Sequence, residues 1–151
     1  MKMDYTLYLI TDRSLMSTKT LQEAVEQATL GGCTMVQLRE KNIEALDFYT
    51  LARDIKLVTD SYHIPIIIND RIDIALSVNA AGVHVGQNDI PVSVARKIIG
   101  KHMILGVSAS SVQEALQAQN DGADYLGVGA MFPTRTKTDA KIVSMDELRR
   151  I

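Results

Sequence analysis

The chain has 151 residues with a hydrophobic share of 46% and a charged share of 23%, which is typical of a folded globular protein and excludes a disordered one. Its 16 Lys and Arg and 18 Asp and Glu give a formal net charge of −2. This balance excludes a general electrostatic footprint for nucleic acid or an anionic membrane, so a bound anion needs a local cluster of cations. Because there is one cysteine, Cys33, and no long apolar run near the start, we expect a single cytoplasmic domain over residues 1–151.

Short apolar segments alternate along the chain with longer segments of helical spacing. The apolar segments are β-branched or aliphatic and are bounded by Gly, Pro, Asn or Asp, which predicts strands. The predicted strands are residues 5–10, 35–38, 65–68, 83–85, 103–107 and 125–128.

Capping residues and apolar spacing predict the helices between these strands. Three capping boxes mark helix starts, namely Thr20 with Glu23, Ser111 with Glu114, and Ser144 with Glu147. The predicted buried faces are Leu21, Val25 and Ala28 in the first helix, and Leu46, Tyr49, Ile55 and Val58 in the second. Glycine in a left-handed conformation is predicted to close helices at Gly31–Gly32, Ala81–Gly82 and Asp121–Gly122.

Polar residues follow each predicted strand, and this pattern selects a fold. Alternating strands and helices predict a parallel sheet, either open and doubly wound or closed into a barrel. An open sheet binds ligands mainly at its switch point, whereas a barrel gathers residues from several strand ends. The strand-end residues are Thr11–Asp12, Arg39 with Lys41, Asn69–Asp70, Gln87 with Asp89, Ser108, and Thr134 with Thr136–Lys137. The pattern favours an α/β fold of the TIM (β/α)8-barrel type, of which about six βα units are present.

Alternation along the second strand supports a barrel mouth. Gln37, Arg39 and Lys41 share one face, opposite Leu38 and Glu40. A row of polar and charged side chains is costly on a strand that is covered on both faces, but it is suited to the open end of a barrel, where ligands bind. The alternative is that this strand simply ends in solvent.

Three cations and two carboxylates predict a metal-assisted site for a polyanion. Arg39, Lys41 and Lys137 follow different strands and suit a phosphate or diphosphate. Asp70 and Asp89 beside such an anion would repel it unless Mg²⁺ lay between them. The alternative for each aspartate is a helix cap, for the helix after Asp70 and for the helix that Pro91 begins.

Two further candidates are Ser108, directly after the strand predicted at residues 103–107, and His84, within the strand predicted at residues 83–85. Ser108 is free to point at a ligand, because Ser111 and Glu114 already cap the next helix. His84 alternates with Val83 and Val85 and should face the interior, either as a hydrogen-bonded structural imidazole or as a catalytic one. The segment 127–137 is rich in glycine and then in hydroxyl groups, a composition that suits phosphate.

Six motifs in order resemble the thiamine-phosphate synthase family. They are residues 8–12 (YLITD), 37–41 (QLREK), 68–71 (INDR), 82–87 (GVHVGQ) with Asp89, 106–108 (GVS), and 127–137, which ends in FPTRTK. The family is a (β/α)8 barrel that joins a pyrimidine diphosphate to a thiazole phosphate and releases diphosphate. The resemblance therefore implies a transferase of thiamine biosynthesis with Mg²⁺ as its cofactor and small molecules as its partners.

The resemblance also implies roles for individual residues. The implied catalytic residues are Arg39, Lys41, Ser108 and Lys137, and the implied metal ligands are Asp70 and Asp89. The implied substrate-binding residues are Gln37, Arg39, Glu40, Lys41, Asn69, Ser108, Thr134, Arg135, Thr136 and Lys137. Cations around the departing diphosphate would stabilise its growing charge, so no protein nucleophile is required.

Two alternatives stay open. A thiazole tautomerase shares the barrel but not the diphosphate–metal chemistry, and an inert barrel fragment would only bind or regulate. The second alternative arises from length, since eight units of about 23 residues need roughly 190 residues. On this ground we expect strands seven and eight to be missing, little activity in this chain, and either self-association through open sheet edges or a marginally folded chain.

Overall fold

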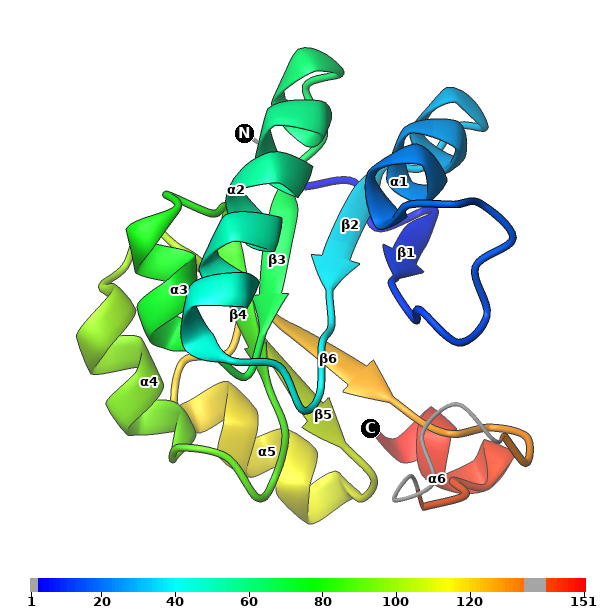
Figure 1. The fold of residues 1–151 in the computed structure, drawn as a ribbon. Helices are drawn as coiled ribbons and strands as arrows, with labels where there is room; N and C mark the ends of the chain where they lie inside the picture. The colour runs from blue at the N-terminus through cyan, green and yellow to red at the C-terminus, as the bar shows by residue number, and fades with distance from the viewer. Residues whose placement is uncertain (1–2, 135–140) are drawn as a thin grey trace. The chain divides into compact units, whose positions relative to one another are not determined.

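Parallel strands alternate with helices in the computed structural model, which describes residues 3–134 and 141–151 (Figure 1). The elements in chain order are β1 (Tyr8–Ile10), α1 (Leu21–Leu30), β2 (Met35–Leu38), α2 (Ala45–Ser61), β3 (Ile66–Asn69), α3 (Ile72–Ser77), β4 (Gly82–Val85), α4 (Val92–Ile99), β5 (Ile104–Ala109), α5 (Val112–Asn120), β6 (Tyr125–Val128) and α6 (Met145–Arg150). The α/β class, the parallel pairing and the six βα units of the sequence-based prediction are confirmed, while closure into a complete barrel stays a prediction.

The chain divides into two compact units, residues 1–83 (unit 1) and residues 84–151 (unit 2), and β4 crosses the boundary between them. In unit 1, β1, β2 and β3 pair in parallel and in chain order, with Tyr8 opposite Met35 and Val36 opposite Ile66. In unit 2, β5 pairs with β6 in parallel, with Ser108 opposite Gly127. A single domain over residues 1–151 stays a prediction.

The core of unit 1 lies on both faces of its sheet. Every residue of β2 and β3 is buried, because a parallel strand is covered on both sides. Apolar side chains account for this except near the carboxyl ends, where Gln37 and Asn69 are only 2% and 7% exposed. The polar residues that the sequence singles out on these two strands are therefore buried near the strand ends.

Local capping signals give the helix starts correctly. The hydroxyl groups of Thr20, Ser111 and Ser144 each accept a hydrogen bond from the backbone N–H three residues later, at the start of α1, α5 and α6. Helix α4 begins one residue after Pro91, which occupies the cap position instead of the first turn. The three predicted helix starts are confirmed, but the glutamates accept the N–H groups of Lys19, Ser110 and Val112 instead of those of the cap residues.

Two details of the helix predictions are wrong. The buried face of α2 is formed by Phe48, Leu51 and Ile55, while Leu46 is 74% exposed, so the predicted face is rotated. Helix α3 ends before Asn79, which takes the left-handed conformation with φ 52°, and Gly82 belongs to β4. Asparagine tolerates this conformation better than most residues with a side chain, so no glycine is needed there.

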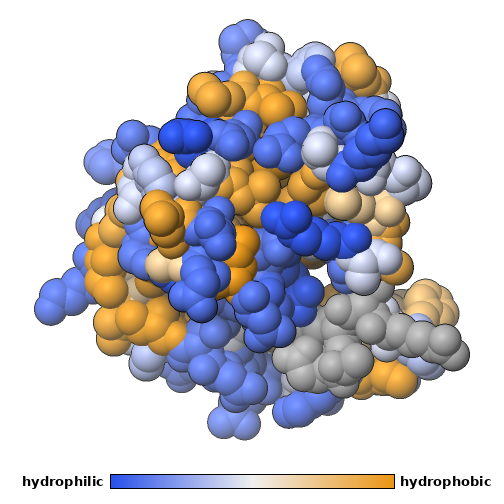
Figure 2. Space-filling view, viewed as in Figure 1, coloured by the Kyte–Doolittle hydropathy of each residue, from blue (hydrophilic) through white to orange (hydrophobic). Residues whose placement is uncertain are grey.

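The outer surface carries apolar side chains in separate places. On the face seen in Figure 2, hydrophobic residues are interrupted by hydrophilic ones. Leu57 on α2, Ile98 on α4 and Leu116 on α5 are among the exposed apolar residues. No helix of the described residues combines the length and the hydropathy needed to cross a membrane.

Arg96 on α4 connects several backbone segments of unit 2. Its Nε donates to the carbonyl oxygen of Gly122 at 3.0 Å, and its Nη1 donates to those of Gly100 and Met103 at 2.7 and 2.8 Å. Its Nη2 lies 2.5 Å from the carboxylate of Asp124, which also accepts the N–H of Leu105. The guanidinium thus holds the end of α4, the start of β5 and the loop before β6 together.

We expect Arg96→Lys to lower the free energy of unfolding by about 2–3 kcal/mol, because the single ammonium group of lysine cannot make all the hydrogen bonds that the guanidinium nitrogens make. Urea denaturation of both proteins measures the change. Arg53→Lys is the matched control, since within residues 3–134 and 141–151 Arg53 pairs only with its neighbour Asp54 at the surface and should lose less than about 0.5 kcal/mol. Equal losses in the two variants would contradict a clamping role for Arg96.

Candidate active site

Thr11 joins the carboxyl ends of β1 and β2 in unit 1. The side chain is 3% exposed, and its Oγ1 accepts the backbone N–H of Arg39 at 3.0 Å. The N–H of Thr11 donates in turn to the carbonyl oxygen of Gln37 at 3.0 Å. This pair of contacts fixes the backbone from which Arg39 projects. The sequence marked Thr11 only as a strand-end residue and gave no sign of this role.

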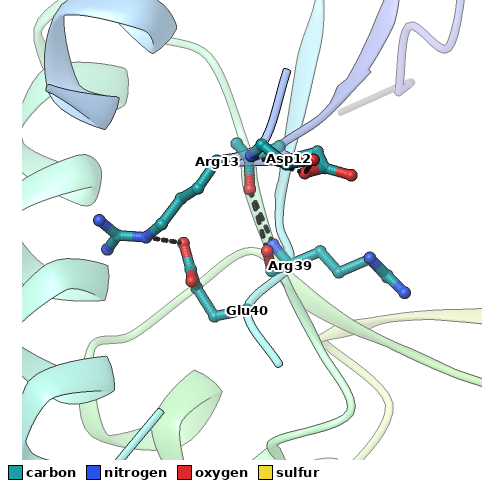
Figure 3. Close-up of polar contacts among 6 residues, drawn as sticks. Asp12, Arg13, Arg39 and Glu40 are labelled. Atoms are coloured by element: carbon teal, nitrogen blue, oxygen red, sulfur yellow. Dashed lines mark hydrogen bonds and ion pairs between the residues drawn. The ribbon is translucent and has the colours of Figure 1, made fainter. Parts of the chain in front are cut away.

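Arg39 and Glu40 point in opposite directions from the end of β2 (Figure 3). Glu40 accepts a hydrogen bond from Nε of Arg13 at 2.8 Å, and its side chain is 8% exposed while that of Arg13 is 49% exposed. The predicted alternation of Arg39 against Glu40 is therefore confirmed. A direct contact of Glu40 with substrate stays a prediction, and the structure places its carboxylate against Arg13.

Asp12 places a fixed negative charge near Arg39. Its carboxylate accepts hydrogen bonds from the hydroxyl and the N–H of Ser14, at 2.6 and 2.9 Å. These two bonds, the hydroxyl one foremost, lower the pKa of Asp12 against the opposing effect of burial, and the charge of Arg39 lowers it further. Asp12 is thus ionised at neutral pH and attracts the Arg39 guanidinium.

Gln37 holds its amide in a fixed place inside unit 1. Its Nε2 donates to the hydroxyl of Tyr8 at 2.9 Å, and the residue is 2% exposed. Tyr8 lies on β1 beside the strand that carries Gln37. The sequence singled out Gln37 but not Tyr8.

Lys41 and Asp70 meet at the strand ends of unit 1. The ammonium of Lys41 lies 2.5 Å from Oδ2 of Asp70, and the two side chains are 53% and 21% exposed. Asp70 has a φ of 63°, in a tight turn where the N–H of Arg71 donates to the carbonyl oxygen of Asn69 at 2.8 Å. A left-handed aspartate is uncommon, and such positions cluster at functional sites.

Neither predicted metal ligand acts as a helix cap. Helix α3 has no side-chain cap bond at its start, so the capping alternative for Asp70 is wrong. Helix α4 likewise has none, and Oδ2 of Asp89 instead accepts the N–H of Gly86 at 2.7 Å. Among the described residues there is no group of three or more His, Cys, Asp or Glu that could hold a metal.

A histidine, a serine and a tyrosine form a hydrogen-bonded cluster in unit 2. Nε2 of His84 lies 2.9 Å from Oγ of Ser108, and Nδ1 lies 3.0 Å from the hydroxyl of Tyr125. The imidazole of His84 is hydrogen-bonded, as the structural alternative for this residue expects. Ser111 caps α5, so Ser108 is not used as a helix cap, and its contact with a ligand stays a prediction. Gln87 donates from Nε2 to the backbone carbonyl of Ser108 at 2.6 Å. The sequence gave no sign of Tyr125.

Two glycines make room for this cluster. A Cβ at Gly106 would lie 2.1 Å from Cζ of Tyr125 and 2.5 Å from Nδ1 of His84. A Cβ at Gly127 would lie 3.1 Å from Cε1 of His84. A glycine inside a strand indicates a close approach, so Gly106 was the readable signal for the cluster.

We expect Gly106→Ala to destabilise the protein by about 1–3 kcal/mol, because the methyl group overlaps the rings of Tyr125 and His84, which must both shift. Thermal or urea unfolding measures this loss. Gly31→Ala is the control, since Gly31 has a φ of −74° and its nearest Cβ contact is 3.3 Å. A Gly106 variant as stable as the Gly31 variant would contradict the packing described.

The last predicted residues lie at the edge of the described chain. Thr134 is exposed, and Arg135, Thr136 and Lys137 lie outside the described residues. Unit 1 brings together Arg39, Lys41, Asn69 and Asp70 at the ends of β2 and β3, and unit 2 carries Asp89 and Ser108. Chemically, the unit 1 cluster offers an arginine and a lysine to an anion and a carboxylate to a cation.

Comparisons with known proteins agree on one family. The family model described as thiamine monophosphate synthase matches residues 7–151. The thiamine-phosphate synthase of Clostridium beijerinckii is 63% identical over 150 residues, which are 99% of this chain and 72% of that protein. The thiamine-phosphate synthase of Ruminiclostridium cellulolyticum is 65% identical over 150 residues, 99% of this chain and 71% of that protein.

A solved structure extends this similarity to the fold. The thiamine phosphate pyrophosphorylase from Pyrococcus furiosus superposes with a TM-score of 0.85 and 40% identity, over 95% of this chain and 67% of that one. Because the relatives match this chain over 99% of its length, the doubt about its activity that length raised is not borne out. The chain belongs to the thiamine monophosphate synthase family.

Proposed function

We propose that this protein joins 4-amino-2-methyl-5-hydroxymethylpyrimidine diphosphate to 4-methyl-5-hydroxyethylthiazole phosphate, giving thiamine phosphate and diphosphate. The bond between the pyrimidine methylene carbon and the diphosphate oxygen breaks, and its electron pair leaves with diphosphate. The lone pair of the thiazole nitrogen then forms the new carbon–nitrogen bond. The observation that carries this proposal is the joining of Lys41 and Asp70 beside Arg39 at neighbouring strand ends, in a chain of this family.

The pyrimidine diphosphate is assigned to Gln37, Arg39, Lys41 and Asn69. An amide both donates and accepts, as the edge of an aminopyrimidine requires, and Tyr8 already orients the amide of Gln37. Arg39 suits two phosphate oxygens at once, whereas Lys41 acts as a point charge. Thr11 fixes the backbone from which Arg39 projects, so binding needs to order only its side chain.

Asp70 and Asp89 fit a magnesium ion by the chemistry of their donor groups. Carboxylate oxygens are the ligands that Mg²⁺ takes most often, together with phosphate oxygens of a substrate. Each carboxylate has two oxygens with about four lone-pair positions; Lys41 contacts Oδ2 of Asp70, and the N–H of Gly86 donates to Oδ2 of Asp89. Bound there, Mg²⁺ would supply positive charge to the diphosphate oxygens.

The residues of this chain stabilise the leaving group and do not attack the substrate. Negative charge grows on diphosphate as the carbon–oxygen bond breaks, and the amino group of the pyrimidine delocalises the matching positive charge. Arg39 and Lys41 face that negative charge as fixed cations, and the hydroxyl of Ser108 donates to it. No covalent intermediate with the protein is needed.

The thiazole phosphate is assigned to Thr134, Arg135 and Thr136, and a further diphosphate contact to Lys137. This part of the proposal rests on the motif at residues 132–137, whose threonine hydroxyls and cations suit a phosphate monoester. Glu40 contributes by holding Arg13 and the strand end that carries Arg39.

Calorimetry tests the assignment of substrates. We expect the protein to bind the pyrimidine diphosphate, and Mg²⁺ to tighten that binding. Binding of the thiazole phosphate with no measurable binding of the pyrimidine diphosphate would overturn the synthase assignment in favour of thiazole chemistry alone.

A further inference from the structure

The imidazole of His84 is held on both sides in unit 2, and the proposed reaction gives it no task. Its Nε2 lies 2.9 Å from Oγ of Ser108 and its Nδ1 lies 3.0 Å from the hydroxyl of Tyr125. The residue is 8% exposed, and its ring centroid lies 5.5 Å from that of Tyr125. The three side chains come from β4, β5 and β6, so they form the row Tyr125–His84–Ser108 across three strands.

The backbone leaves space for the two rings where they lie. The missing Cβ atoms of Gly106 and Gly127 are what allow the rings of His84 and Tyr125 to approach β5 and β6. Rotation of the imidazole would lose both hydrogen bonds within a buried space, which is costly for polar atoms. The two hydrogen bonds therefore hold the row in position, while its hydrogen atoms have alternative placements.

A bound diphosphate selects one of these placements. Diphosphate oxygens accept hydrogen bonds, so the single hydrogen of the Ser108 hydroxyl must point at the anion. Oγ of Ser108 is then an acceptor toward His84, which requires a hydrogen on Nε2. Nδ1 of a neutral imidazole is then an acceptor as well, and the hydroxyl of Tyr125 must donate to it.

We propose that His84 and Tyr125 are positioning residues, which hold the imidazole as the Nε2–H tautomer so that Ser108 presents its hydrogen to the diphosphate. This inference rests on the proposed function, which supplies the diphosphate. A positioning role differs from a packing role because it depends on one ring nitrogen, Nε2, which must donate a hydrogen bond to Ser108. No proton is transferred along the row; it orients a donor toward charge that grows in the reaction.

A matched pair of substitutions separates positioning from packing. In His84→Gln the amide nitrogen takes the place of Nε2 and still donates to Ser108, whereas in His84→Asn it takes the place of Nδ1 and does not reach Ser108. We expect His84→Asn to lower kcat/KM for thiamine phosphate formation by about 10- to 100-fold, as Ser108→Ala does, and His84→Gln by less than about 3-fold. In the Ser108→Ala background His84→Asn should cause no further loss.

Two outcomes of the kinetic experiment would overturn the inference. One is an equal loss in His84→Gln and His84→Asn, and the other is an additive loss when His84→Asn is combined with Ser108→Ala. Circular dichroism and unfolding curves of each variant show whether it is folded, and the rescue by glutamine is the readout that a purely structural role would not give.

Nitrogen NMR of the wild-type protein tests the tautomer without any turnover. On addition of inorganic diphosphate with Mg²⁺, we expect the His84 signals of a neutral ring with its hydrogen on Nε2. A hydrogen on Nδ1 alone, or on both nitrogens, would overturn the inference. Wild-type protein that binds diphosphate in this way but makes no thiamine phosphate would overturn the proposed function and leave the positioning role in place.

Discussion

Asp70→Asn is expected to lower the Mg²⁺-dependent formation of thiamine phosphate by about 100-fold or more while the protein stays folded. The substitution removes the negative charge that suits a hard cation but keeps the shape of the side chain. Asparagine also tolerates the left-handed backbone of this position, where φ is 63°. Steady-state rates over a range of Mg²⁺ concentrations measure the effect, and Asp89→Asn should behave in the same way.

Loss of the Lys41–Asp70 ion pair should not by itself unfold the protein. The two side chains are 53% and 21% exposed, and such pairs contribute about 0–1 kcal/mol. Asp73→Asn is the matched control, because Asp73 lies three residues away, is 63% exposed and pairs only with Arg71 in the contacts described. Near-normal rates without divalent metal in both Asp70→Asn and Asp89→Asn would show that neither residue is a ligand.

Lys41→Ala should weaken binding of the pyrimidine diphosphate by about 1.5–3 kcal/mol, which is roughly 10- to 150-fold in Kd. The lysine supplies one charge-assisted contact to the diphosphate, and the thiazole phosphate should bind almost as before. Isothermal titration of both substrates measures the difference. Lys56→Ala is the control, since Lys56 pairs with Asp60 along α2 and should bind both substrates normally. Equal weakening for the two substrates would remove Lys41 from the diphosphate site.

The fold could be predicted from the sequence because its signals are local. Parallel strands are buried on both faces, so β2 and β3 are apolar except at Gln37 and Asn69, and each capping box lies within four residues. The two errors in the helix predictions occur at positions where more than one residue type can meet the structural requirement. Asn79 takes the left-handed position that the prediction gave to a glycine, and Phe48 replaces Leu46 on the buried face of α2.

The site could be predicted only in part, because its contacts join distant parts of the sequence. Alternation on one strand placed Arg39 opposite Glu40, as the structure does. Nothing local joins Glu40 to Arg13, 27 residues earlier, or His84 to Tyr125, 41 residues later. Only the glycine at position 106, inside a strand, hinted that a side chain approaches the backbone there.

Formation of thiamine phosphate by the purified protein is the most direct test of this account. The pyrimidine diphosphate, the thiazole phosphate and Mg²⁺ are supplied together and then with each one omitted, and thiamine phosphate and diphosphate are both quantified. The account predicts equal amounts of the two products from the complete mixture and none when any one component is missing. A protein that binds both substrates with Mg²⁺ present but releases no diphosphate would contradict it.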